Sequence, residues 1–265
     1  MSKFDKYGLC LEEYTNNKNN AEVYYNRAIG KSPEMEVSKA LAGIIKKIIK
    51  KNEKILDVGC ACGHYYRSLK KKIKHNFYYT GLDPYKIFLD KAKLAWQNDK
   101  NVTFKKGNIF NIPFVKNRFD ITVCNNVLLH LPTIEKPISE LMRVTKKTLI
   151  LRTVVYDYSY RVQLVYNSKW WKGTSIKPED EFDRKGNPKS FSYFNIHSFD
   201  YLKSLIKKKY RTAKIQFVKD DFFSKKNIQS SSRSEKRPLA TRIIGKEQFS
   251  GCLMQPHYFV IINKQ

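Results

Sequence analysis

The chain has 265 residues, of which 42% are hydrophobic and 14% aromatic, so one large domain with a sizeable core is expected. No stretch approaches the roughly 20 continuous apolar residues of a membrane span. The first residues, MSKFDKYGLCLEEY, lack the apolar segment of a signal peptide. These features argue against a helical membrane protein and predict a soluble, cytoplasmic one.

The formal net charge of +27 suits nucleic acid, anionic lipid or an acidic small molecule as a partner. Only 11 of the 51 basic residues are Arg, whereas sites that bind phosphate usually favour the Arg fork. A Lys excess with many Asn and Ile also arises from compositional bias on any surface. Compositional bias is therefore a better explanation of the positive charge than a dedicated anion-binding function.

Five cysteines, Cys10, Cys60, Cys62, Cys124 and Cys252, form no disulfide framework in a chain of this length. Cys60 and Cys62 are close in sequence, but no second Cys or His pair stands at metal-binding spacing. We therefore predict packed thiols and no metal site.

The predicted elements begin with a polar arm over residues 1–35 and an amphipathic helix. The segment SPEMEVSKALAGIIKKIIKK places Ser32 as a cap before apolar residues at helical spacing. Apolar runs then predict strands at 54–59, 76–83, 102–108, 119–126, 148–155, 213–222 and 257–264. Helical segments separate most of these strands, which predicts an α/β fold with a doubly wound, mostly parallel, seven-stranded sheet.

Two polar, aromatic-rich segments interrupt this pattern, at about 156–196 after the fifth strand and about 219–256 after the sixth. We interpret them as insertions in a single domain over residues 36–265. Loops at strand tips carry specificity in such folds, so the insertions and the arm are expected to face the substrate.

The first strand ends in the loop DVGCACGHYY, residues 57–66. Gly59 and Gly63 permit a sharp turn and close approach of the backbone to a ligand. A dinucleotide loop of the G-x-G-x-x-G type also needs glycine at 61 and 64, where Ala61 and His64 stand. The loop therefore fits NAD or FAD poorly.

Asp83 follows about 20 residues later, at the tip of the second strand. An acid there can accept hydrogen bonds from both ribose hydroxyls of a nucleoside. Asp57 adds a second carboxylate at the first loop. Two acids suit a cationic nucleoside without phosphate better than a dinucleotide.

Four segments in order, ILDVGCACG, YYTGLDPYKIFLDKAK, VTFKKGNIFNIPF and FDITVCNNVLLHLP, resemble the motifs of the Rossmann-like S-adenosylmethionine (SAM)-dependent methyltransferases, small-molecule type. The resemblance covers about residues 36–155 well and 198–218 and 257–263 more loosely. It implies SAM as cofactor, bound by Asp57, Gly59, Ala61, Gly63, Asp83, Pro84, Asn108, Ile109 and Asn125.

The resemblance also implies which part of SAM each of these residues would contact. The Asp57–Gly63 loop would surround the methionine end of SAM, and Asp83 the ribose, with Pro84 or Tyr85 packing beside the adenine. Asn108 and Ile109 would meet the adenine edge, and Asn125 would lie near the sulfonium. Ala61 replaces a common glycine, Asn108 replaces a common Asp, and the usual Pro-Gly-Gly turn before strand five is absent.

Methyl transfer mainly requires a positioned acceptor, and a hydroxyl acceptor also benefits from a base. His130, five residues after Asn125, lies where some small-molecule members of the family carry a basic histidine, so we predict it as the base. His197, before the sixth strand, is the second candidate. For both, packing or capping a helix is the alternative.

Substrate-binding residues are predicted in the arm and the insertions: Tyr14, Tyr25, Trp170, Trp171 and Arg237. The two tyrosines would close over SAM as a lid. The tryptophans among lysines suit a sugar or a nucleotide-bearing anion, and Arg237 would hold phosphate. The alternatives are ordinary packing, a small satellite core and a solvated hairpin.

These features predict O-methylation of a small anionic metabolite, such as a phosphorylated or nucleotide-linked saccharide that serves surface-polysaccharide synthesis. One alternative is an RNA methyltransferase, motivated by the charge of +27. Strand four ends in CNNV instead of the Asn-Pro-Pro-aromatic signature of exocyclic-amine methylases, so nucleic acid is not favoured. The other alternative is a SAM-binding partner subunit without catalysis.

Overall fold

The structure, a computed structural model, describes residues 18–165, 181–189, 191–221, 241–244, 247–250 and 255–264. Its helices are α2 Lys18–Ile29, α3 Glu36–Lys46, α4 His64–Lys72, α5 Lys86–Ala95, η1 Leu128–His130, α6 Glu135–Val144 and α8 Phe199–Lys209. Its strands are β1 Lys54–Val58, β2 Tyr78–Asp83, β3 Val102–Lys106, β4 Phe119–Asn125, β5 Thr145–Tyr156, β6 Gln163–Val165, β7 Phe191–Tyr193, β8 His197–Ser198, β9 Lys214–Lys219, β10 Thr241–Ile244, β11 Glu247–Ser250 and β12 Gln255–Asn263. Within these ranges, every helix is too short or too polar to cross a lipid bilayer.

Seven of the described strands form the predicted doubly wound sheet, in the order β3-β2-β1-β4-β5-β12-β9. The pairings from β3 to β5 are parallel, and β12 runs antiparallel to both of its neighbours, β5 and β9. The chain winds from β1 outward to β3 and then returns to β4 on the other side of β1. This reversal makes the carboxyl ends of β1 and β4 the topological switch point, the position at which open α/β sheets bind ligands.

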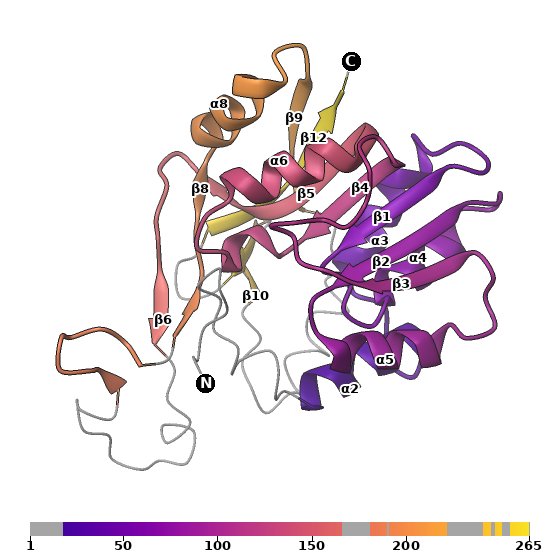
Figure 1. Cartoon of the computed structure of the whole chain (residues 1–265), viewed down its shortest axis with the longest axis horizontal. Coiled ribbons are helices and arrows are strands. Elements are labelled where there is room, and N and C mark those ends of the chain that lie inside the picture. Colours follow the sequence, from indigo (N-terminus) through magenta and orange to yellow (C-terminus); the bar gives the residue numbers. More distant parts are fainter. Residues whose placement is uncertain are drawn as a thin grey trace.

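Helices cover both faces of the sheet (Figure 1). The amphipathic α6 and α8 bury Leu141, Leu202 and Ile206 against one face. On the other face, Leu41 of α3 and Tyr66 of α4 pack on the sheet. Both cores are apolar and exclude water from the middle of the sheet. Buried polar side chains near the carboxyl edge of the sheet are therefore candidates for a functional site.

The predicted start of the helix after the arm is wrong, for a tertiary reason. The helix expected from Ser32 begins at Glu36, and its cap, Met35, makes no side-chain capping bond. The segment before Glu36 is instead held against α4. Arg67 of α4 donates to the carbonyl of Ser32 (3.0 Å), and Ser68 donates to the carboxylate of Glu34 (2.6 Å). Residues 127–144 form two helices, η1 and α6, with Pro132 between them, because proline cannot donate within a helix. The arm contains helix α2.

The insertions contribute strands at the edge of the molecule. After β5, β6 and β7 form an antiparallel pair, and β8 adds to β5. After β9, β10 and β11 form a hairpin that extends the sheet from the start of β12.

Candidate cofactor and acceptor site

The loop after β1 has three residues with left-handed backbone. Gly59, Ala61 and Gly63 have φ of 83°, 45° and 71°. A Cβ at Gly59 would stand 2.3 Å from a methyl carbon of Val127, and one at Gly63 2.7 Å from the Phe104 ring. Glycine is therefore required at both positions, while Ala61 holds a strained conformation. Gly63 also caps α4, so the first amides of that helix face the loop.

Two acids are buried beside this loop. Asp57 on β1 accepts a hydrogen bond from the Tyr79 hydroxyl (2.6 Å). Asp83, at the tip of β2, accepts from the backbone amides of Ala61 and Tyr85, both at 3.0 Å. Burial raises the pKa of Asp57 to about 7 and that of Asp83 to about 6. Among the described residues, no basic side chain forms an ion pair with either acid.

Asn125, at the tip of β4, is 6% exposed. Both polar atoms of its side-chain amide are buried and lack a hydrogen-bond partner among the described residues. An unsatisfied buried amide is costly, so Asn125 is a candidate for contact with a ligand.

A buried ion pair that the motifs did not predict holds the turn after Asn125. Arg152 on β5 contacts the carboxylate of Asp220 through Nε (2.7 Å) and a terminal nitrogen (2.6 Å), and both side chains are nearly inaccessible. Its other terminal nitrogen donates to the side chain of Asn126, and the backbone amide of Asn126 donates to the carbonyl of Arg152 (2.9 Å). Asn126 has a φ of 56°, so this clamp fixes a sharp turn directly after Asn125.

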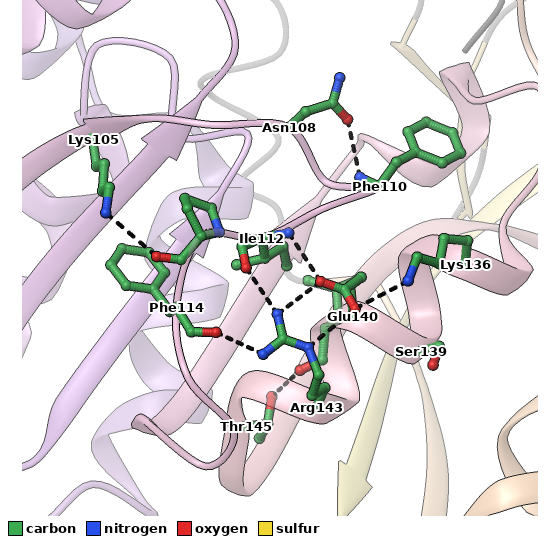
Figure 2. Close-up of polar contacts among 12 residues, drawn as sticks. Lys105, Asn108, Phe110, Ile112, Phe114, Lys136, Ser139, Glu140, Arg143 and Thr145 are labelled. Carbon is green, nitrogen blue, oxygen red and sulfur yellow. Dashed lines mark hydrogen bonds and ion pairs between the residues drawn. The ribbon is translucent and has the colours of Figure 1, made fainter. Parts of the chain in front are cut away.

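A second network holds the loop after β3 (Figure 2). Glu140 on α6 accepts a hydrogen bond from the amide of Ile112 (3.0 Å), and Arg143 donates to the carbonyls of Ile112 (2.8 Å) and Phe114 (2.6 Å). Asn108, predicted at the adenine edge, accepts from the amide of Phe110 (2.9 Å), and the neighbouring Ile109 is buried in the core. The Glu140–Arg143 clamp thus fixes the loop that carries both predicted adenine contacts.

Helix α2 of the arm packs beside the cofactor loop. Its Tyr24 stacks on His64, with ring centroids 4.9 Å apart, and its Tyr25 lies under the ammonium of Lys91 on α5. Tyr25 joins Ala61 and Tyr85 in a small apolar cluster. His64 is buried with both ring nitrogens unpartnered in the described part of the chain, and burial lowers its pKa to about 3.

His130 ends η1, five residues beyond Asn125. Its Nδ1 lies 2.9 Å from the carbonyl oxygen of Tyr193 on β7, so the first insertion holds the ring. A carbonyl can only accept, so in the neutral ring Nδ1 carries the hydrogen and Nε2 the lone pair. His197 is buried, bonds the carbonyl of Leu128, and has a pKa lowered to about 4 by burial.

A pocket of about 300 Å³ opens beside η1. Its polar lining includes Glu135, Ser159, Arg161, His197 and Tyr201. The Tyr201 hydroxyl donates to Glu135, and Arg161 donates to the carbonyl of Pro132 (2.8 Å).

Four predicted substrate residues, Tyr14, Trp170, Trp171 and Arg237, lie outside the described residues. Cys60, Cys62 and Cys124 are buried free thiols, as expected for packed cysteines. In the described ranges, no group of three His, Cys, Asp or Glu side chains is arranged to hold a metal ion.

The family model described as "Methyltransferase domain" matches residues 49–182, half of the chain. The chain belongs to this methyltransferase family. An uncharacterized methyltransferase of Schizosaccharomyces pombe is 32% identical over 139 residues, which are 46% of this chain and 50% of that protein. The "probable methyltransferase" ltbC of Aspergillus luteorubrus is 28% identical over 70% of each chain. This methyltransferase therefore spans 50% of the first relative's length and 70% of the second's.

A solved SAM-dependent methyltransferase of Methanosarcina mazei has the same fold. It superimposes with a TM-score of 0.50 at 18% identity, covering 83% of this chain and 96% of the other. That protein is SAM-dependent, and SAM is also the cofactor that the sequence motifs of this chain imply. The unsatisfied Asn125 amide and the two acids without a basic partner fit a cationic nucleoside that has ribose hydroxyls.

Proposed function

We propose that this methyltransferase transfers a methyl group from SAM to a hydroxyl of a small anionic metabolite, with His130 as the general base. The acceptor class is a phosphorylated or nucleotide-linked saccharide. The observation that supports the proposal is the hydrogen bond between His130 Nδ1 and the Tyr193 carbonyl (2.9 Å), because it fixes the ring of a histidine that follows Asn125 by five residues in the chain.

In the proposed cofactor site, Asp83 accepts hydrogen bonds from the ribose hydroxyls and Asn125 bonds the amino-acid end. The Gly59–Gly63 backbone lies against the methionine chain, and Asn108 and Ile109 border the adenine. Each carboxylate oxygen can accept more than one hydrogen bond, so Asp83 retains acceptor capacity beside its two backbone donors. SAM supplies a methyl carbon that its sulfonium already activates.

His130 can accept the proton that a hydroxyl loses when its oxygen bonds the methyl carbon. The C–S bond breaks in the same step, so the products are the methyl ether, S-adenosylhomocysteine (SAH) and a protonated His130. The Tyr193 carbonyl stabilises the imidazolium, since the Nδ1 hydrogen bond strengthens when the ring is charged. His197 suits this role less well, because its pKa of about 4 makes it a weak base.

The pocket beside η1 supports a polyhydroxylated acceptor. Arg161 donates and Glu135 accepts hydrogen bonds on its walls, and the rings of Tyr160 and Tyr201 supply apolar faces. Sugar rings present hydroxyls at their edges and C–H groups on their faces, which match such a lining. An attached phosphate would pair with Arg161.

The test is incubation of the enzyme with labelled SAM and a panel of sugar phosphates, nucleotide sugars and RNA. We expect transfer to a hydroxyl of a panel sugar, and a loss of about 100-fold or more in kcat for His130→Gln with SAM affinity preserved. His75→Gln, at an exposed histidine, is the matched control and should retain most of the wild-type kcat.

Transfer to RNA alone, or unchanged kcat in His130→Gln, would overturn the proposal. SAM binding without transfer to any acceptor would instead support a non-catalytic partner subunit.

A further inference from the structure

The two acids at the tips of β1 and β2 are unusual in a chain this basic. Asp57 is 1% exposed and Asp83 is 5% exposed. The chain has 51 basic residues, yet none of the described ones forms an ion pair with either acid. Burying an unpaired carboxylate is costly, so the site is built for a positive charge that the protein itself does not supply.

The groups that face the two carboxyls confirm this imbalance. They are Tyr79 on β2, Cys60 and Cys62 in the loop, Tyr65 on α4 and Cys124 on β4, and all of these side chains are neutral or, if ionised, negative. Lys91 on α5, which acts on Cys62, forms an ion pair with Glu22 (2.5 Å). Arg152, which Tyr65 also faces, is neutralised by Asp220.

We propose that Asp57 and Asp83 make the site select SAM over its product SAH by charge, and that acidification abolishes this selectivity. SAM and SAH share the adenosine and the amino-acid end, so they can make the same hydrogen bonds. They differ by the methyl group and by the positive charge of the sulfonium. An ionised pair of buried carboxylates therefore favours SAM and promotes release of the neutral product.

Burial and hydrogen bonding of Asp57 and Asp83 together determine how SAM binding depends on pH. Burial raises the pKa of Asp57 to about 7, against the opposing effect of the Tyr79 hydrogen bond, and raises that of Asp83 to about 6. Both carboxyls are thus ionised at pH 8.5 and mostly protonated at pH 5.5. A bound sulfonium lowers both pKa values, so SAM binding near pH 6.5 releases protons.

This inference rests on the placement of SAM over β1 and β2 and is independent of the acceptor. Its test is calorimetric titration of the enzyme with SAM and with SAH at pH 5.5, 6.5, 7.5 and 8.5. From Asp57 alone, the Kd for SAM should rise by up to about thirtyfold between pH 8.5 and pH 5.5. The Kd for SAH should rise less, because both ligands carry the α-ammonium but only SAM carries the sulfonium charge, and titrations at pH 6.5 in two buffers of different ionisation enthalpy should show more protons released by SAM.

Two variants and one control test whether the two acids cause the pH dependence of SAM binding. Asp57→Asn keeps the shape and the contact with Tyr79, and should bring the Kd for SAM at pH 8.5 close to that for SAH. Tyr79→Phe removes a hydrogen bond that favours the ionised form, so the midpoint of SAM binding should move up by about one to two pH units. Asp90→Asn, an exposed acid paired with Lys86, is the control and should change neither ligand's profile.

Equal pH dependence for SAM and SAH in the wild type would overturn the inference, as would an unchanged midpoint in Tyr79→Phe. Absence of binding by both ligands at every pH would also overturn it, and would in addition contradict the cofactor site. A wild type that binds both ligands but shows no methyl transfer leaves the inference standing and refutes only the proposed O-methylation.

Discussion

Replacing Arg143 by Met should destabilise the protein and weaken cofactor binding together, because Arg143 fixes the loop after β3 (Figure 2). The guanidinium donates to the carbonyls of Ile112 and Phe114 and makes two hydrogen bonds, of 3.0 and 2.7 Å, to Glu140. Met covers a similar length of apolar surface and removes only the donors.

The expected loss in the free energy of unfolding depends on which contacts Glu140 keeps in Arg143→Met. Glu140 has a side chain only 7% exposed, and without Arg143 it keeps the amide of Ile112 and a longer contact to Lys136 (3.4 Å). Breaking a buried pair costs about 3–5 kcal/mol, and the partial exposure of Arg143 places the expected loss near the lower bound, about 3 kcal/mol. Glu140→Gln, which keeps the shape, should cost about 1–2 kcal/mol.

The double variant Arg143→Met with Glu140→Gln should lose about 1–2 kcal/mol less than the sum of the single variants, since no charge is then left unpaired. Urea unfolding at pH 7.5 measures these free energies, and calorimetry measures the Kd for SAH. The looser loop should raise that Kd by about tenfold, or about 1.4 kcal/mol. Lys136→Met, which alters an exposed contact, is the control and should stay within about 0.5 kcal/mol of the wild type.

Strictly additive losses, or an Arg143→Met protein that unfolds at the wild-type urea concentration, would refute the reasoning. The dependence of stability on acidic pH provides a second test of the contact between Glu140 and Arg143. Burial opposes ionisation of Glu140, but hydrogen bonds from Arg143 and Ile112 and the charge of Arg143 outweigh it and lower its pKa. The clamp therefore contributes fully above the ordinary Glu pKa of 4.5 and is lost as the pH falls through the lower folded value.

Three further predictions concern the remaining parts of the site. Ala61→Gly should raise the free energy of unfolding by about 1 kcal/mol by relieving the φ of 45°; a lower melting temperature would contradict this. Arg152→Met should cost about 3–5 kcal/mol in urea unfolding, and adding Asp220→Asn should recover part of it, whereas no recovery would show that their charges are not coupled. The raised pKa of Asp57 stabilises the ligand-free fold below its ordinary value of 3.8, and this contribution is lost as the pH rises to about 7. Asp57→Asn should therefore raise the melting temperature of the ligand-free protein at pH 8, and an unchanged value would count against an ionised buried carboxyl.

The amino-acid sequence by itself determined the sheet and the loop that begins the site. Strand periodicity and the spacing of helices predicted the seven strands of the doubly wound sheet, because burial on both faces demands short apolar runs. The glycines of the β1 loop and Asp83 could also be located, since a tight turn at a strand tip and an acid at the next tip are local features. His130 could be singled out by its distance along the chain from Asn125, but its contact with Tyr193 could not.

Only the tertiary structure revealed the pairs that hold the site together. Arg152 and Asp220 are 68 residues apart, and nothing local distinguishes them from other charges of a lysine-rich chain. Glu140 and Arg143 stand at an ordinary helical spacing, which would suit an exposed pair equally well. Their loop partners, like the Glu34 and Arg67 contacts that displace the start of α3, come from remote segments. Local sequence specifies backbone conformation and burial, whereas the partner of a buried charge is decided by which segments the fold brings into contact.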